Sequence, residues 1–296
     1  MRRPSPLVAI FLTIFLDMLA FGMAIPDLQL RGESLGARGL LLGLIQSSFS
    51  IAQFFTAPIL GRWSDTAGRK PVLLFTTLLS LGAFISYGFA FSIPIMFLSR
   101  ILGGIGGANI GVAFAYIADV TKPEERAKGM GILGAAFGLG FIFGPVLGYF
   151  LVEWGGGGPG LLGLVGSLLC LVNFAFIWFA IQETSTRRQP ASRSVGESVR
   201  LLGRALRTPT LGTLILLYFS ANFAFSNLEA TFFRLIHAQY GMQREGAFAL
   251  AWVGITAAII QGGLIGRLAK RFGELNLMRF GYALQSPTLA IVPFLP

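Results

Sequence analysis

The sequence predicts an all-α membrane protein, and three observations support this prediction. The 296 residues are 54% hydrophobic and only 12% charged. The mean hydropathy is +0.72, and a soluble domain cannot bury so large an apolar fraction. The apolar residues form long runs, whereas a membrane β-barrel would give short segments of alternating polarity. The sequence therefore favours a bundle of membrane-spanning helices.

Nine apolar runs are long enough to cross a bilayer as helices, since a spanning helix needs about 20 residues. The first run is too long for a cleavable signal peptide and contains Asp17, so we expect it to remain as the first span. The predicted spans are Leu7–Leu28, Leu40–Leu60, Val72–Phe91, Pro94–Ile117, Gly129–Val152, Leu161–Ile181, Leu211–Ile236, Ala247–Leu268 and Leu275–Pro296.

The basic residues lie mainly in alternate loops between these runs. Of the 23 lysines and arginines, 18 fall in one set of loops, four fall in the opposite set, and Arg100 lies inside a span. Because cytoplasmic loops of membrane proteins carry the excess of basic residues, we expect a cytoplasmic N-terminus and a place in the cell inner (plasma) membrane. This topology accounts for the net charge of +10 without a nucleic-acid partner, which would require a basic stripe.

Two parts of the chain resemble each other at a constant offset. Gly61-Arg62 recurs as Gly266-Arg267, an offset of 205 residues, and Ala20-Phe21-Gly22 aligns with Ala224-Phe225-Ser226, an offset of 204. Two features that agree on one shift indicate a duplicated bundle. Parallel repeats joined by a central linker are a known plan of membrane proteins.

We therefore expect three units along the chain. Residues 1–181 form an N-terminal six-helix bundle, 182–209 form a polar cytoplasmic linker with a surface helix around Val199–Leu206, and 210–296 form a partial C-terminal bundle with spans seven to nine. Two bundles of six would need twelve spans. We expect the last three to be missing from a shortened chain, and a complete nine-span protein is the alternative.

Four stretches of the chain resemble signatures of one family. They are Leu16-Asp17 with Gly22 and Pro26 in span one, the loop Gly61–Pro71, the span-four stretch Arg100–Ala108 followed by Tyr116–Asp119, and the span-five stretch Gly140–Gly148. Together they resemble the major facilitator superfamily, and most of all its drug:proton antiporter branch, which includes tetracycline and multidrug efflux pumps. The resemblance covers essentially the whole chain.

The resemblance implies a fold of two six-helix bundles with alternating access between them. It implies secondary active transport, specifically proton-coupled efflux (antiport) of drug-like small molecules such as tetracycline. A metabolite or sugar symporter of the same fold is one alternative, because fold alone does not decide function. A truncated, non-transporting membrane fragment is the other.

The expected partners are a small-molecule substrate, protons and the lipid bilayer, and we expect a monomer. No enzyme, metal or cofactor signature is found in the sequence. The glycine run Gly103–Gly107 lies within a span and lacks the Lys-Ser/Thr that follows in a nucleotide-binding loop.

Asp17 and Arg100 are the candidate residues for proton coupling. Asp17 lies about 15 Å from the start of span one, near the bilayer centre, where a carboxylate is costly and is usually functional. Arg100 lies within span four at a depth from which its side chain could reach Asp17. We expect the two to interact if their helices are neighbours. A purely structural ion pair is the alternative.

A cytoplasmic gate is implied by the family resemblance of the Gly61–Pro71 loop. We expect Gly61 and Gly68 to allow a tight turn, and Asp65 to cap a helix or meet a helix N-terminus. Arg69 can bind a carboxylate bidentately, and Asp119 is its candidate partner. The resemblance implies that this network latches the outward-facing state. The alternative is that the basic residues of this loop only follow the general excess of basic residues in cytoplasmic loops, with Asp65 a turn residue.

The antiporter signature on span five consists of small residues and a proline. Gly140, Gly144 and Gly148 recur every four residues and share a helix face, while Pro145 can kink the helix. This face could form a hinge or seal between the two halves, or it could serve plain helix packing.

Polar and aromatic residues in the spans are candidates for the substrate cavity. Interhelical hydrogen bonding and lipid-facing packing are the alternatives for the same residues. The candidates that we select are Gln46, Gln53, Asn109, Asn222 and Phe223, and Asn173 in span six is a further polar candidate.

Overall fold

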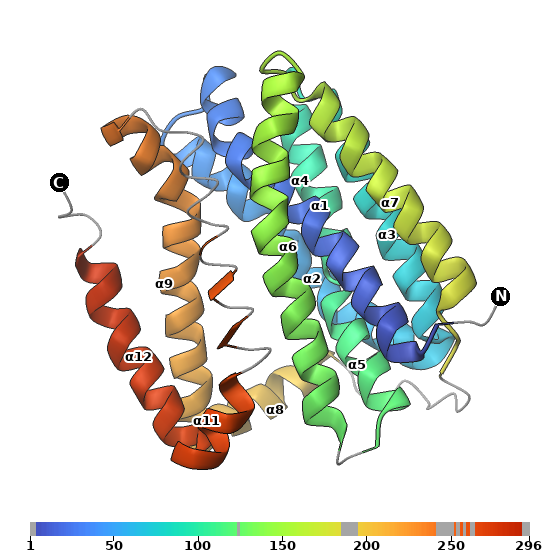
Figure 1. The fold of residues 1–296 in the computed structure, drawn as a ribbon, viewed down its shortest axis with the longest axis vertical. Coiled ribbons are helices and arrows are strands. Elements are labelled where there is room, and N and C mark those ends of the chain that lie inside the picture. The colour runs from blue at the N-terminus through green and yellow to red at the C-terminus, as the bar shows by residue number, and fades with distance from the viewer. Residues whose placement is uncertain are drawn as a thin grey trace.

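The computed structural model describes residues 4–122, 125–184, 195–240, 252, 255–256, 259–260 and 264–291, and its regular structure there is helical. Figure 1 shows the arrangement of the helices. Their bounds are α1 Pro6–Ser34, α2 Leu40–Ala67, α3 Arg69–Gly88, α4 Ile93–Gly107, α5 Ile110–Val120, α6 Arg126–Trp154, α7 Gly160–Ala180, α8 Val195–Arg207, α9 Pro209–Tyr240, α11 Ile265–Phe272 and α12 Glu274–Ile291.

The first six predicted spans are confirmed. Six helical segments among the described residues are long and apolar enough to cross a membrane: α1, α2, α3, the consecutive pair α4 and α5, α6, and α7. The chain is therefore a multi-pass membrane protein. The predicted linker helix is also present, because α8 includes Val199–Leu206.

The later predicted spans are described only in part. Helix α9 contains the whole of the seventh predicted span. Most of the eighth, Ala247–Leu268, lies outside the described residues, as do residues 292–296 at the end of the ninth. The division of the chain into two bundles joined by a linker stays a prediction.

Helix α1 occupies the centre of the N-terminal part of the molecule. It packs most extensively on α6 and also contacts α7, while α3 packs against α4 and α7. Helix α9 contacts α1 and α12, and it lies to one side of the bundle (Figure 1). Side chains on different faces of α1 therefore reach both the bundle interior and the first helix beyond the linker.

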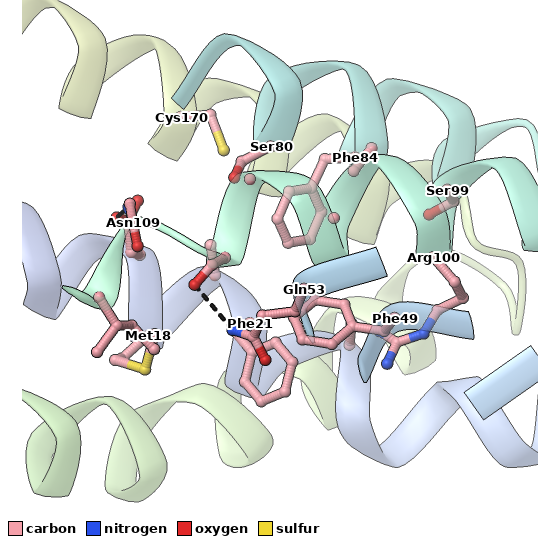
Figure 2. Close-up of a pocket in the computed structure, with 18 of the residues that line it drawn as sticks. Met18, Phe21, Phe49, Gln53, Ser80, Phe84, Ser99, Arg100, Asn109 and Cys170 are labelled. Atoms are coloured by element: carbon pink, nitrogen blue, oxygen red, sulfur yellow. Dashed lines mark hydrogen bonds between the residues drawn. The ribbon is translucent and has the colours of Figure 1, made fainter. Parts of the chain in front are cut away.

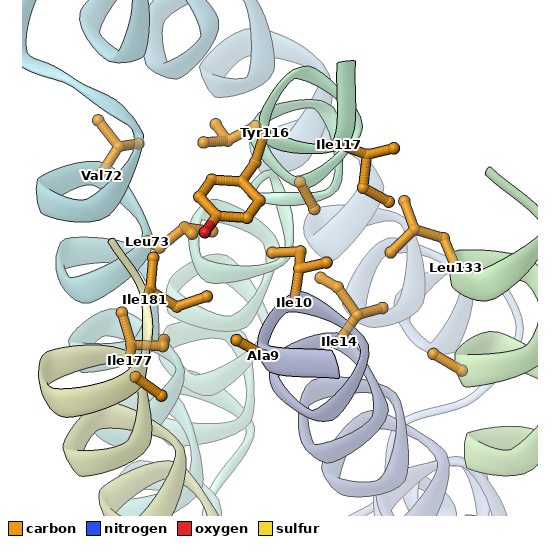
Figure 3. Close-up of a cluster of buried hydrophobic side chains, with 14 of the residues drawn as sticks. Ala9, Ile10, Ile14, Val72, Leu73, Tyr116, Ile117, Leu133, Ile177 and Ile181 are labelled. Atoms are coloured by element: carbon orange, nitrogen blue, oxygen red, sulfur yellow. The ribbon is translucent and has the colours of Figure 1, made fainter. Parts of the chain in front are cut away.

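The buried apolar side chains form two separate clusters along the bundle. One contains Ile10, Ile14, Tyr116 and Ile177 (Figure 3), and the other is centred on residues such as Met23. Along α1, Met18 belongs to the first cluster and Met23 to the second. Asp17 lies where the first cluster ends.

The signature glycines of span five pack against α1 rather than between two halves. A Cβ atom at Gly144 would lie 2.8 Å from the Cα atom of Gly22, and one at Gly22 would lie 3.3 Å from the Cδ atom of Pro145. Cβ atoms at Gly140 and Gly148 would meet the backbone of Met18 and Met23. The structure thus places this face in close helix packing within the bundle, which is one of the two predicted roles, and the hinge or seal stays a prediction.

The predicted fourth span is interrupted. Helix α4 ends at Gly107 and α5 begins at Ile110, so Ala108 and Asn109 form a short turn inside the membrane-spanning segment. The preceding glycines have low helix propensity, and the carbonyl oxygen of Gly107 accepts a hydrogen bond of 2.8 Å from Gln53 Nε2. Side-chain donors of this kind allow an irregular backbone within a membrane protein.

The close approach of α6 to α1 predicts that Gly144→Ala destabilises the protein. The added methyl group would overlap backbone atoms of α1, and overpacking of this kind costs about 1–3 kcal/mol. We expect a lower thermal unfolding temperature in detergent.

Gly131→Ala is the matched control on the same helix, because nothing lies within 4 Å of its Cβ position. Alanine at an open helical position stabilises by about 0.5–1 kcal/mol relative to glycine. Equal unfolding temperatures for the two variants would contradict the packing that we describe.

Candidate functional site

A cavity of about 360 Å³ opens inside the N-terminal bundle, next to α9. Its wall combines phenylalanine rings with a few polar side chains, and Figure 2 shows its central part. The lining residues are Asp17, Met18, Ala20, Phe21, Ala24, Phe49, Gln53, Ser80, Ala83, Phe84, Tyr87, Ser99, Arg100, Gly103, Gly106, Gly107, Asn109, Ile110, Phe137, Phe141, Cys170, Asn222 and Ser226.

Three of the five cavity candidates line this space: Gln53, Asn109 and Asn222. Gln46 does not, because it lies two helical turns from Gln53 along the same face of α2. Phe223 does not either. It follows Asn222 on α9, so its side chain points in another direction, and its ring stacks on Phe219 at 6.1 Å between centroids.

Asp17 lies on the cavity wall and receives hydrogen bonds from two asparagine amides. Asn109 Nδ2 donates to Asp17 Oδ2 at 2.6 Å, and Asn173 Nδ2 donates to Asp17 Oδ1 at 2.8 Å. Asn109 lies in the α4–α5 turn and Asn173 on α7. The carboxylate of α1 therefore joins three parts of the bundle. The role of Asn173 could have been suspected from its polarity, but not from its position in the sequence.

Arg100 lies at the other side of the cavity. Its guanidinium carbon is 4.5 Å from the centre of the Phe49 ring, as expected for a cation–π contact. Figure 2 shows Arg100 and Asn109 on opposite sides of the labelled phenylalanine rings. Arg100 precedes Asn109 by nine residues, which is roughly 13 Å along a helix.

The expected ion pair between Asp17 and Arg100 is not among the ion pairs of the described residues. The physical reason is that Asp17 is satisfied by amides from nearer positions. Both proposed coupling residues nevertheless line the same cavity.

The expected loop Gly61–Pro71 is almost entirely helical. Only Gly68 lies between α2 and α3, and its φ of +104° is a conformation that glycine adopts readily. Gly61 lies inside α2, where nothing is within 4 Å of its Cβ position, so the tight turn does not depend on it. Asp65 is in the last turn of α2 and does not cap a helix start.

Arg69 is the centre of a polar network at this turn. Its Nη1 donates to Asp65 Oδ1 at 2.6 Å and its Nε donates to Asp119 Oδ2 at 3.0 Å. Nη1 also donates to Ser64 Oγ at 2.7 Å. The structure thus brings together all three charged residues predicted for the gate. Arg69 ties the end of α2 and the start of α3 to the end of α5.

Glu183, at the start of the linker, caps α3 and was not predicted from the sequence. Its carboxylate accepts the backbone N–H groups of Arg69 at 2.8 Å and Lys70 at 3.2 Å. A Cβ at Gly68 would collide with this carboxylate. Thr184 Oγ1 donates to Asp119 Oδ2 at 3.2 Å. Glu183 and Thr184, at the start of the predicted linker, are therefore in contact with the same network.

A second buried ionic group lies at the opposite end of the bundle. Asp27 is 6% exposed and accepts a 2.8 Å hydrogen bond from Tyr87 Oη. Arg31 pairs with Asp27 at 3.3 Å and donates to the Gly157 carbonyl at 2.6 Å. These contacts connect α1, α3 and the turn after α6.

The family model of the Major Facilitator Superfamily matches residues 10–296. The chain belongs to this superfamily. It is 31% identical to the tetracycline resistance protein, class B, of Escherichia coli, over 98% of this chain and 73% of that protein. It is 29% identical to multidrug resistance protein 2 of Bacillus subtilis, over 90% of this chain and 67% of that protein.

A solved member of the superfamily has the same arrangement of helices. The crystal structure of the human organic anion transporter MFSD10 matches with a TM-score of 0.69 at 27% identity, covering 88% of this chain and 72% of that one. The major facilitator fold expected from the sequence is therefore confirmed.

The contact between Glu183 and α3 predicts that Glu183→Ala loosens the start of this helix. The N–H groups of Arg69 and Lys70 would lose their acceptor, and loss of a helix cap costs about 1 kcal/mol, which is about fivefold in a local opening equilibrium. We expect faster hydrogen–deuterium exchange at these amides, measured by mass spectrometry in detergent.

The control is Glu153→Ala, near the end of α6 and beside the Asp27 group at the opposite end of the bundle. It should leave exchange at Arg69 and Lys70 unchanged. Equal exchange in the wild-type protein and Glu183→Ala would mean that the cap contributes nothing to the start of α3.

Proposed function

We propose that this protein is a proton-coupled antiporter that exports drug-like small molecules such as tetracycline. One observation carries the proposal: a carboxylate on the wall of a membrane cavity is held by two neutral amides. Ionisable groups inside a membrane bundle are costly and mark ion or proton pathways. A carboxylate that has no cation among its described hydrogen-bond donors can alternate between an ionised and a neutral form without leaving a partner charge buried.

The composition of the cavity supports an aromatic or amphipathic substrate. Five phenylalanines line it together with Arg100 and Gln53, and its volume of about 360 Å³ falls within the usual range for small-molecule sites. Apolar walls with a few polar groups suit flat molecules that carry polar substituents. The similarity to tetracycline and multidrug resistance proteins supports the same substrate class.

The Arg69 network supports a gate at the cytoplasmic end of the bundle. We propose that it latches one state of an alternating-access cycle in which residues 1–181 and 210–296 rock about the linker 182–209. The positions of the basic residues support a cytoplasmic N-terminus and a place in the cell inner membrane. We propose a monomer as the working unit, with protons, substrate and lipid as its partners.

The proposal predicts that Asp17→Asn abolishes transport driven by a proton gradient. The amide has nearly the same size as the carboxylate but cannot take up a proton in this pH range. In proteoliposomes with an imposed pH gradient, we expect tetracycline movement by the variant to fall to the level of protein-free liposomes.

Exchange of labelled tetracycline at equal pH tests whether binding survives, and we expect it to be retained. Glu153→Gln serves as a control carboxylate outside the cavity. Undiminished gradient-driven transport by Asp17→Asn would refute the assignment of Asp17. Proton and substrate movement in the same direction would favour the symporter alternative, and the absence of exchange by the wild-type chain would favour a non-transporting fragment.

A further inference from the structure

Two buried asparagines hold the carboxylate of Asp17 and have an unused acceptor each. We propose that Asn109 and Asn173 are positioning residues for Asp17: both donate to the ionised carboxylate, and Asn109 also accepts from the protonated one. This inference rests on the proposed function, because it concerns the proton that Asp17 is proposed to carry.

The hydrogen bonds in this structure fit the ionised form of Asp17, because both amides donate to its carboxylate oxygens. Each carboxylate oxygen accepts one short amide bond, of 2.6 Å from Asn109 and 2.8 Å from Asn173. Both asparagines are only 1% exposed, so water does not replace these donors easily. Hydrogen bonds from polar donors to a charged acceptor are stronger than those between neutral groups.

The protonated form of Asp17 needs a hydrogen-bond acceptor for its O–H group, and the amide oxygens of the two asparagines are candidates. Asn109 Oδ1 and Asn173 Oδ1 are buried and accept no hydrogen bond from any described residue. A buried carbonyl oxygen without a donor is unfavourable, and such atoms in folded proteins call for an explanation. Their occurrence on both partners of one carboxylate points to another state of the site, in which one of these oxygens accepts from the protonated acid.

A side-chain amide can change from donor to acceptor by rotation about its last torsion, which exchanges the NH₂ group and the oxygen. When Asp17 takes a proton from water in the cavity, one carboxylate oxygen becomes an O–H donor. A rotated amide then presents its oxygen to that O–H group. When the O–H bond breaks, the proton returns to water, and the amide rotates back.

The two amides differ in how firmly they are held. Asn173 Nδ2 also donates to the Thr13 carbonyl at 3.2 Å, whereas Asn109 lies in the α4–α5 turn and lines the cavity. We therefore assign the rotation to Asn109 and the anchoring of the carboxylate to Asn173.

Other charged or titratable groups on the cavity wall are few among the described residues. They are Arg100 on α4, Cys170 on α7 and Tyr87 on α3, and Tyr87 donates to Asp27. The cavity residues of α2, α5, α6 and α9 are neutral. The two amides are thus the groups that bond directly to Asp17, and removing either one should change its titration.

The test is an infrared titration of the purified chain in detergent, in which the carboxylic-acid band lost in Asp17→Asn reports the proton on Asp17. We expect Asn173→Leu to raise the pH midpoint of this band by about one unit, because it removes a donor to the ionised form. Asn109→Leu should raise the midpoint less, because it removes a hydrogen-bond partner from the protonated form as well. The midpoint of gradient-driven transport in proteoliposomes should rise in parallel.

Thr77→Val is the control for a loss of buried polarity alone. Thr77 is fully buried on α3 and bonds only to the carbonyl of Leu73 among the described contacts, so its variant should keep the wild-type midpoint. The two asparagines lie on different parts of the bundle, and alanine replaces leucine at a position where the leucine variant does not fold.

An unchanged midpoint in Asn173→Leu, a rise in Asn109→Leu as large as that in Asn173→Leu, or an equal rise in Thr77→Val would overturn the assignment. Failure of the proposed function has a different signature. In that case the wild-type protein would show no gradient-driven transport, although the Asp17 band could still be titrated and its dependence on Asn109 and Asn173 measured.

Discussion

The carboxylate of Asp17, inside the membrane bundle, is the constraint on which the arrangement of the bundle depends. A charge in a membrane interior must be given hydrogen-bond donors or be neutralised. Asn173 supplies one donor from α7, and Asn109 supplies the other because the helix is interrupted between α4 and α5. A continuous fourth helix would place Asn109 differently. The break between α4 and α5 therefore allows Asn109 to donate a hydrogen bond to the carboxylate on α1.

The same reasoning explains the turn between α2 and α3. A single residue, Gly68, reverses the chain, and the N–H groups at the start of α3 are then left without helical acceptors. Glu183 accepts two of them, while Arg69 binds Asp65 and Asp119. Glu183 lies at the start of the predicted linker, so a displacement of the linker would also move an acceptor of the network around Arg69. If this network acts as the proposed gate, the gate is coupled to the predicted linker.

The sequence predicts those features that depend on one helix at a time. Hydropathy places the first six spans correctly because each helix must bury its backbone in the bilayer. The sequence also identifies Asp17 as a candidate functional residue, because a charged residue within an apolar run is rare. The partners of Asp17 and the cap at α3 are not found, because they depend on which helices are neighbours. Asn173 is 156 residues from Asp17, and Glu183 lies in a polar segment where a carboxylate gives no distinguishing signal. The Arg69 contacts were expected only through the family resemblance.

The position of Asp17 between two apolar clusters restricts how a proton can reach it. The cluster around Ile10 and Tyr116 fills the bundle on one side, and the cluster around Met23 fills it on the other. Close packing leaves no room for a water chain through such clusters. The cavity beside α9 is therefore the opening from which water can approach the carboxylate, and under the proposed function the substrate uses the same cavity. If protons and substrate use one cavity, movement of α9 relative to α1 changes the access of both together, which is what coupled exchange requires.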